Sequence, residues 1–352
     1  AMEEAIAKGV GLIEQGRTEE IEEVVRKALL VSRDVDVGQD FFENLNTRWS
    51  RLYCAESRES FRTVFNFLDD CIDGNGLSRK ELAMVIAPPG WGKSIYLVNQ
   101  GIRSLMEGKN VLHVSLEMGE DKVAQRYDSA ISLIPHEKLK MWDIQKKIGE
   151  RLSIFRNEFG SQLFIKEYPT RGINVNSLRS LLVQLKNYEE FVPDIVIVDY
   201  LELLNSVRQS EQEYRAQQNI AEELRGFAHE ANVLLWTATQ TNRMGRSVQI
   251  ITDKELGDSY GKIRTADFAI SLNQTEEEFD NGRMRIYVVK NRNGIAKKTF
   301  KSQIDYGCLV MKEIKTLESA IRISLCNSIS IKIIVSIEKW KSYWIIIYSR
   351  ST

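Results

Sequence analysis

The stretch Ala87-Pro88-Pro89-Gly90-Trp91-Gly92-Lys93-Ser94 decides the fold of this chain. It follows an apolar run, residues 82–86, that predicts a buried strand, and it precedes residues 95–106, which have helical spacing. A strand, a glycine-rich loop, Gly-Lys-Ser and a helix in this order are typical of a phosphate-binding P-loop. In such a loop, glycines let backbone N–H groups approach phosphate oxygens, and the helix N-terminus adds partial positive charge.

The loop residues have distinct expected roles. Lys93 is expected to reach the β- and γ-phosphates of a bound nucleotide, and the Ser94 hydroxyl to ligate Mg²⁺. The other predicted nucleotide contacts in this stretch are Pro89, Gly90, Trp91, Gly92 and Ile95. The strict motif begins with glycine, whereas this chain has Ala87, so the alternative is an ordinary strand–turn–helix connection.

The composition is that of a globular protein: 352 residues, 43% hydrophobic and 28% charged. The net charge of −1 gives no global attraction for nucleic acid, although a basic face can still bind it. The four cysteines are scattered, which predicts neither a zinc site nor a disulfide framework and fits a reducing cytoplasm. Without a signal peptide or an apolar stretch of membrane-spanning length, a cytoplasmic protein that does not contact a membrane is expected.

The pattern divides the chain into an N-terminal helical and linker segment (1–59), a main domain (60–314) and a C-terminal tail of unclear status (315–352). Residues 3–31 have helical spacing, and residues 61–72 also predict a helix. The main domain alternates apolar runs with longer helical stretches, which predicts an α/β fold with a mostly parallel sheet flanked by helices. The apolar runs are 82–86, 111–116, 163–166, 195–198, 233–238, 267–272 and 285–289, and the helical stretches are 95–107, 120–133, 137–159, 176–190 and 212–231.

Polar residues follow three of the apolar runs, where parallel strands would place ligand-binding groups. Asp199 is expected to hold Mg²⁺, directly or through water. Glu117 is a candidate general base that polarises the attacking water. Gln240 can sense the γ-phosphate or orient water. Singly, Asp199 could cap a turn, Glu117 could start a helix, and Gln240 could be a solvated strand end. Together after a P-loop, they predict a nucleoside triphosphatase.

Residues 77–311 resemble the RecA-like ATPase domain of the DnaB family of replicative helicases. The resemblance is carried by Ser115–Met118, Asp199–Leu201, Gln240–Arg243, Gly257–Asp267 and Lys290–Gly294. The last segment, Lys-Asn-Arg-Asn-Gly, is the most specific, because Lys-x-Arg-Asn-Gly is not a general RecA feature. Ala87 also fits, since these helicases commonly begin the P-loop with alanine.

The resemblance implies a ring-shaped homo-hexamer that uses ATP and Mg²⁺ to move along single-stranded DNA and unwind duplex, with primase and a helicase loader as candidate partners. The catalytic residues it implies are Glu117, Lys93, Arg292 and Gln240, with Arg126 on the triphosphate. Lys290 and Arg292 would enter the nucleotide site of the neighbouring subunit, where an arginine finger stabilises charge on the transferring phosphoryl group. The alternative reading of Asn293-Gly294 is a hairpin turn, and both can hold.

Single-stranded DNA is expected at two loops, residues 205–218 and 243–262. The predicted DNA contacts are Arg208, Arg215, Asp258, Ser259, Tyr260, Gly261 and Lys262. Two other functions stay open: a filament-forming RecA-like recombinase, and a binding module with a slow regulatory ATPase. The usual N-terminal helical domain has no counterpart beyond residues 3–31, which suggests either a helicase of phage or plasmid type or a truncated chain.

Overall fold

The computed structural model describes residues 41–42, 44–53, 59–73, 76–208, 212–241, 250–252 and 260–314. The chain divides into two units, residues 1–58 and residues 59–352. The described part of the first unit contains helix α3 (Leu45–Tyr53). The helices predicted within 3–31 and the C-terminal tail, 315–352, lie outside the described residues.

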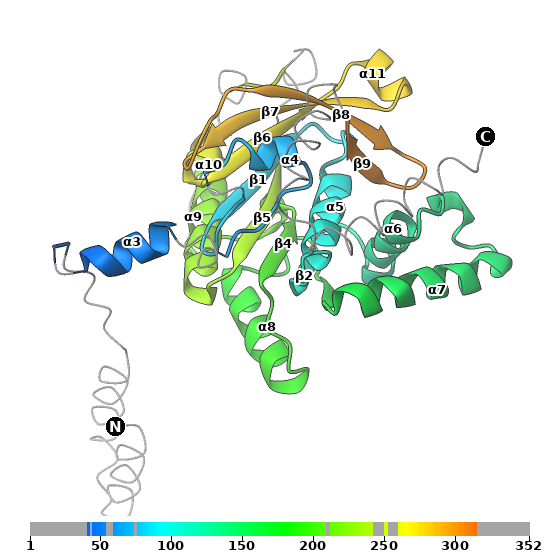
Figure 1. Cartoon of the computed structure of the whole chain (residues 1–352), viewed down its shortest axis with the longest axis horizontal. Helices are drawn as coiled ribbons and strands as arrows, with labels where there is room; N and C mark the ends of the chain where they lie inside the picture. Colours follow the sequence, from blue (N-terminus) through cyan, green and yellow to red (C-terminus); the bar gives the residue numbers. More distant parts are fainter. Residues whose placement is uncertain are drawn as a thin grey trace, which may run out of the picture. The chain divides into compact units, whose positions relative to one another are not determined.

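A nine-stranded sheet forms the centre of the described part of the second unit, in the order β3-β2-β4-β5-β1-β6-β7-β8-β9 (Figure 1). The strands are β1 (Leu82–Ala87), β2 (Val111–Ser115), β3 (Leu163–Glu167), β4 (Ile195–Asp199), β5 (Leu234–Gln240), β6 (Phe268–Asn273), β7 (Arg283–Asn291), β8 (Thr299–Asp305) and β9 (Val310–Glu313). Strands β1 to β6 pair in parallel, and β7, β8 and β9 continue the sheet in antiparallel. The predicted mostly parallel sheet is confirmed.

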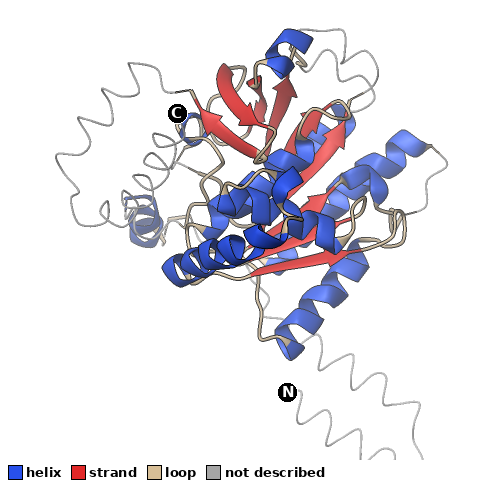
Figure 2. Ribbon diagram, turned by 90° about the vertical axis from the view of Figure 1, so that its right-hand side faces the viewer, coloured by secondary structure: helices blue, strands red, loops and turns tan. Residues whose placement is uncertain are grey.

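Helices cover both faces of this sheet (Figure 2). Helices α5 (Lys93–Leu105), α6 (Glu120–Ser132) and α7 (Trp142–Phe159) share one apolar core with Ala83, Val85 and Ala87 of β1. Helices α8 (Val175–Tyr188), α9 (Glu213–Ala231) and α10 (Tyr260–Thr265) share the other core with Leu82, Met84 and Ile86. Because successive side chains of a strand point to opposite faces, β1 must be apolar throughout. Short elements complete the unit: α4 (Asn66–Asp69), α11 (Glu276–Asp280) and the 3₁₀ helices η3 (His136–Lys138) and η4 (Leu201–Leu203).

The helix predicted over residues 61–72 is wrong, because only α4 is helical there. Phe61 instead pairs with Leu77 in an isolated antiparallel bridge. The backbone N–H and the hydroxyl of Thr63 both donate to Asp69 Oδ1, at 2.7 and 2.8 Å. Such side-chain bonds compete with helix formation. The apolar spacing of this segment therefore reflects burial against the sheet, where Phe61 is fully buried.

The parallel strands end along one side of the sheet and begin along the opposite side, and these two sides are named here the carboxyl edge and the amino edge. The carboxyl edge is the line where the parallel strands end, and its register pairs Ala87 with Gln240 and Ser115 with Asp199. The amino edge is the line where these strands begin. Strand β7 runs antiparallel and ends there, since Asn291 pairs with Phe268 at the start of β6. None of the helices in the described residues is both long and apolar enough to cross a membrane.

Candidate nucleotide site

The phosphate-binding loop has the backbone that its sequence predicts. Gly90 and Gly92 have φ values of +82° and +83°, in the left-handed region that favours glycine. Helix α5 begins directly after them at Lys93, so its free N–H groups face the loop. The strand, the loop and the helix therefore form a cradle for an anion at the carboxyl edge.

Lys93 lies inside this cradle. Its ammonium group donates to the carbonyl oxygens of Ala87 and Pro88, at 3.0 and 3.1 Å, and the residue is only 7% exposed. Burial lowers the pKa of Lys93, and the carboxylates of Glu202 and Asp199 oppose this shift. A buried cation is thus fixed where phosphate oxygens would enter the loop.

Asp199 ends β4 beside the loop and is 1% exposed. Burial raises the pKa of its carboxyl group, and the nearby Ser94 hydroxyl acts in the opposite direction. Neither carboxylate oxygen makes a well-formed hydrogen bond. Because buried polar atoms are normally paired, two orphaned oxygens beside a hydroxyl fit a bound hard cation such as Mg²⁺.

Glu117 and Arg126 flank the same cradle. Glu117 is exposed in the turn after β2, and the Ser115 hydroxyl shapes that turn by bonding both the N–H and the carbonyl of Met118, at 3.0 and 2.7 Å. Arg126 extends from α6 and is half-buried, and burial lowers its pKa. Asp199 and Glu117 both act electrostatically on Arg126 and on Lys93, so these four predicted residues lie near one another.

Gln240 ends β5 next to β1, and its backbone N–H donates to Glu202 Oε1 at 3.1 Å. Glu202 lies in η4 and was not predicted. Its signal in the sequence is a carboxylate three residues after Asp199 within an otherwise apolar stretch, Tyr200 to Leu204.

Lys290 and Arg292 lie at the amino edge, away from the groups described above. Lys290 Nζ donates to the Ala266 carbonyl at 2.6 Å, and burial lowers its pKa. Arg292 is bonded to Asp267 at 2.8 Å and its side chain remains 47% exposed. Strand β1 separates this edge from the P-loop by about 17 Å at ~3.3 Å per residue. Within one chain, the structure therefore does not bring Arg292 to the phosphates.

The hairpin reading of Asn293-Gly294 holds only in part, since the register of β7 and β8 ends at Tyr287 with Thr299 and the connection between them is longer than a two-residue turn. Asn293 lies in a turn, and Gly294 forms an antiparallel bridge with Ile72. A Cβ added to Gly294 would come within 2.1 Å of the Cys71 carbonyl oxygen, so a side chain has no room there. The turn fixes where Arg292 leaves the sheet.

The predicted DNA contacts have different environments. Arg208 is exposed and paired with Glu222 at 3.4 Å, and Arg215 is exposed beside Tyr214. Lys262, in contrast, is only 3% exposed and forms an ion pair with Glu202. Asp258 and Ser259 lie outside the described residues, as do Asn242 and Arg243. For Tyr260 only the backbone is described, and Gly261 packs against Gln218.

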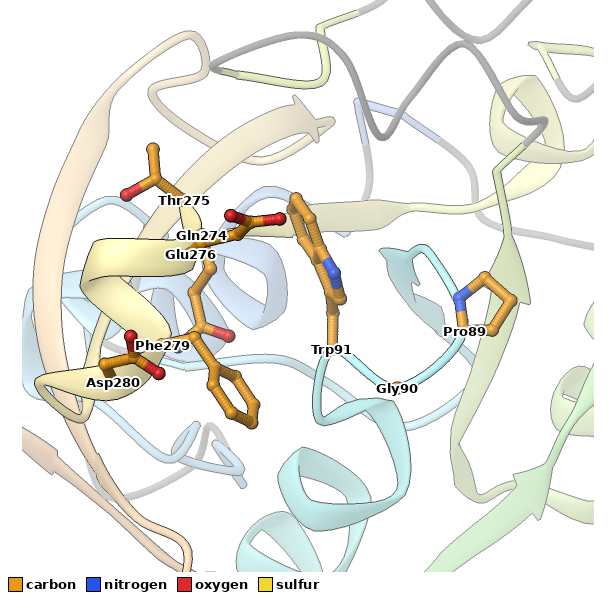
Figure 3. Close-up of a pocket in the computed structure, with 8 residues that line it drawn as sticks. All are labelled: Pro89, Gly90, Trp91, Gln274, Thr275, Glu276, Phe279 and Asp280. Carbon is orange, nitrogen blue, oxygen red and sulfur yellow. The ribbon is translucent and has the colours of Figure 1, made fainter.

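A pocket of about 410 Å³ adjoins the P-loop and was not predicted. In Figure 3, the indole of Trp91 stands between Pro89 and the side chains of Gln274 and Glu276. The amide of Gln274 is held in place, because it accepts from the Tyr306 hydroxyl at 2.8 Å and donates to the Arg283 carbonyl at 2.6 Å. An aromatic wall beside a phosphate cradle suits a nucleobase. The remaining lining residues are Gly90, Thr275, Phe279 and Asp280.

The fold and the site are typical of P-loop proteins of the RecA-like type. The chain belongs to the DnaB-like helicase C terminal domain family, whose model matches residues 60–305, and the predicted resemblance is confirmed. It is 31% identical over 295 residues to the DnaB-like replicative helicase of Enterobacteria phage T4, covering 79% of this chain and 59% of that protein. It is 25% identical over 243 residues to the replicative DNA helicase DnaB of Leifsonia xyli, covering 67% of this chain and 52% of that protein.

Two solved structures share the fold. One is an ATPase domain, with a TM-score of 0.67 and 19% identity, covering 79% of this chain and 100% of that one. The other is a DnaB-like replicative helicase described together with its interactions with primase, with a TM-score of 0.64 and 20% identity, covering 89% of this chain and 76% of that one. The chain spans about half the length of the curated relatives it matches.

Proposed function

We propose that this chain is the motor of a replicative DNA helicase, a ring of identical subunits that hydrolyses ATP to move along single-stranded DNA and unwind duplex. The observation that carries the proposal is the division of the nucleotide-processing groups between the two edges of one sheet. Lys93, Asp199 and Glu117 lie at the carboxyl edge, and Arg292 lies at the amino edge. A complete site therefore needs two subunits. Family membership favours this function over a recombinase or a regulatory ATPase.

The phosphates of ATP would lie in the P-loop, with Lys93 on the β- and γ-phosphates and Arg126 on the triphosphate. Ser94 and Asp199 would hold Mg²⁺, which neutralises phosphate charge when it is bound. The nucleobase would occupy the pocket beside Trp91, whose wall is fixed by the bonds of Gln274. Pro89, Gly90, Gly92 and Ile95 complete the loop around the phosphates.

Glu117 would act as the general base, accepting a proton from the attacking water, and Gln240 would orient that water. Glu117 is exposed at the rim of its own subunit. A neighbouring subunit that covers this rim would exclude bulk water and strengthen every charge interaction in the site.

The neighbour would supply Arg292 and Lys290. Arg292 is anchored at one end by Asp267 while nearly half of its side chain is accessible, which suits a cation presented to another molecule. Helix α7 adds a surface for assembly, because it exposes Trp142 and Ile154, which are 86% and 59% exposed. We infer a homo-hexamer in the cytoplasm, with primase and a helicase loader as further partners.

Single-stranded DNA would contact the loops around Arg208 and Arg215 and the segment that contains Asp258, Ser259, Tyr260 and Gly261. Contacts would be made to phosphates, with little sequence preference. Affinity should then fall steeply with salt, with a slope of roughly −0.7 per neutralised phosphate for single strands. Arg208→Gln should weaken binding equally for all sequences, whereas Arg179→Gln, which removes an exposed cation from α8, should not.

The proposal is tested by three measurements on the same preparation: ATP hydrolysis with and without oligo-dT, unwinding of a forked duplex, and electron microscopy with DNA and a non-hydrolysable ATP analogue. The expected result is DNA-stimulated hydrolysis, unwinding and closed rings. Filaments on DNA would indicate a recombinase instead. Hydrolysis that neither DNA nor protein concentration changes would indicate an isolated regulatory ATPase.

A further inference from the structure

The carboxylate of Glu202 connects three elements: η4, the end of β5 and helix α10. Its Oε1 atom accepts hydrogen bonds from the Gln240 backbone N–H at 3.1 Å and from the Lys262 ammonium at 2.8 Å, as well as from the Thr239 hydroxyl. Glu202 itself lies in η4, directly after β4. A single oxygen atom thus links the end of β4, the end of β5 and helix α10.

Lys262 depends on this bond. Its side chain is only 4% exposed, and its second bond goes to Gln217 Oε1 of α9 at 2.8 Å. Beside Lys262, Gly261 also packs closely against α9, because an added Cβ would lie 2.9 Å from the side-chain oxygen of Gln218. A buried lysine without its carboxylate is strongly disfavoured. The seating of α10 on α9 is therefore tied to Glu202.

Glu202 also faces the nucleotide site. The Gln240 backbone N–H that bonds Glu202 belongs to the register partner of Ala87, and the Ala87 carbonyl accepts a hydrogen bond from Lys93 Nζ at 3.0 Å. Glu202 also acts electrostatically on the Lys93 ammonium, together with Asp199 and Glu117. Its second oxygen, Oε2, is buried and has no hydrogen-bond partner. Glu202 therefore acts on two lysines: it attracts Lys93 of the phosphate cradle electrostatically and bonds Lys262 of α10 directly.

We propose that Glu202 is a positioning residue that transmits the occupancy of the nucleotide site to helix α10, and thereby to the affinity for single-stranded DNA; this inference rests on the proposed helicase function. A bound triphosphate places negative charge on Lys93 and so weakens the attraction between Lys93 and Glu202. The ion pair between Glu202 and Lys262 then becomes stronger, and the position of α10 on α9 changes with it. When the γ-phosphate leaves, Lys93 attracts Glu202 more strongly again, and the ion pair between Glu202 and Lys262 weakens.

The test is the ratio of two dissociation constants for fluorescent oligo-dT, one measured with ADP and one with a slowly hydrolysed ATP analogue, on the full chain. We expect a wild-type ratio of about 5 or more, the usual lower range for coupled sites. Glu202→Gln keeps the size and the acceptor oxygen but removes the charge, and it should bring the ratio close to one. Lys262→Met should do the same. The double variant should resemble either single variant, because residues that act through one contact are not additive.

Two further variants separate coupling from simple stabilisation. Lys262→Arg restores the cation and should recover most of the ratio. Glu230→Gln removes the exposed partner of Arg179 from the same helix, α9, and should leave the ratio unchanged. Each variant is also followed by thermal unfolding and by binding of a fluorescent ATP analogue, so that Lys262→Met and Lys262→Arg decide the matter if Glu202→Gln does not fold.

A wild-type ratio in Glu202→Gln or Lys262→Met, even with a lower unfolding temperature, would overturn the inference, because the pair would then be structural only. Independent, multiplying effects of the two substitutions would overturn it as well. A wild-type protein that binds no single-stranded DNA under any nucleotide condition would instead contradict the proposed function itself.

Discussion

The two edges of the central sheet differ in how completely their charged groups are paired. At the amino edge, Asp267 accepts hydrogen bonds from Arg225, Arg292 and the Leu82 backbone N–H. At the carboxyl edge, both oxygens of Asp199 and one oxygen of Glu202 are buried without a well-formed hydrogen bond. The first edge is internally satisfied and the second is built to receive charged ligands. Under the proposed function, one subunit would offer a half-site for the nucleotide at the carboxyl edge and Arg292 for its neighbour at the amino edge.

The largest expected effect concerns the carboxyl edge. Lys93→Ala should abolish ATP hydrolysis, because the triphosphate loses the buried cation held under the loop. Hydrolysis is measured as phosphate release with and without oligo-dT. Lys186→Ala, which removes an exposed lysine from α8, is the matched control and should behave as wild type. Full activity in Lys93→Ala would remove the phosphate cradle from the account.

The next effect concerns the amino edge. Arg292→Ala should still bind a fluorescent ATP analogue but lose hydrolysis by about a thousandfold, the lower range for an arginine finger. Arg225→Ala is the informative comparison, since Arg225 bonds the same Asp267 carboxylate. It should lower stability by about 1–3 kcal/mol, the range for a broken charged hydrogen bond, with a much smaller loss of turnover. Equal losses of turnover would mean that Arg292 only supports the sheet.

Glu117→Gln tests the base at the carboxyl edge. It should leave nucleotide binding intact and slow hydrolysis by roughly a hundredfold or more, the usual range for a lost general base. Single-turnover hydrolysis separates this chemical step from product release. Glu120→Gln removes a nearby carboxylate at the start of α6 and is the control. A wild-type rate in Glu117→Gln would show that another group takes the proton.

The last effect is on stability and not on turnover, and it concerns the segment that packs against the turn beside Arg292. Burial raises the pKa of Asp69 to about 7, and the bonds from Thr63 and the charges of Arg103 and Arg62 only partly oppose this. Between pH 4 and 7 the folded state binds more protons than the unfolded state, so stability should fall as pH rises. The total is at most about 4 kcal/mol, at about 1.4 kcal/mol per pKa unit.

Urea unfolding at pH 5 and pH 8 measures this dependence. Asp69→Asn mimics the protonated carboxyl and should flatten it, with higher stability than wild type at pH 8. Asp70→Asn changes the exposed neighbouring aspartate and should keep the wild-type dependence. An unchanged pH profile in Asp69→Asn would assign the dependence to another group.

The sequence could predict the carboxyl edge because its groups are local to strand ends. The P-loop, Glu117, Asp199 and Gln240 each follow an apolar run, and parallel pairing brings such ends together. The helix over 61–72 was predicted wrongly because the apolar spacing arises from burial, and Thr63 bonds to Asp69 instead. Strands β8 and β9 have mixed exposure and gave no apolar run to detect.

The remaining site residues depend on contacts between distant parts of the chain. The pairing of Glu202 with Lys262 joins residues 60 positions apart, and that of Asp267 with Arg225 joins residues 42 apart. No local pattern specifies such pairs. The pocket beside Trp91 likewise needs α11 to lie next to the P-loop, which only the sheet order determines.

The most direct test of the divided site is to mix Arg292→Ala subunits with Glu117→Gln subunits and to measure ATP hydrolysis without DNA. Neither variant alone should hydrolyse well. In a randomly mixed ring, roughly one interface in four joins an intact Glu117 to an intact Arg292, because such interfaces are head to tail. We therefore predict recovery of hydrolysis to about a quarter of the wild-type rate at most. Freely exchanging rings that show no recovery would mean that Arg292 acts within its own subunit or only supports the turn.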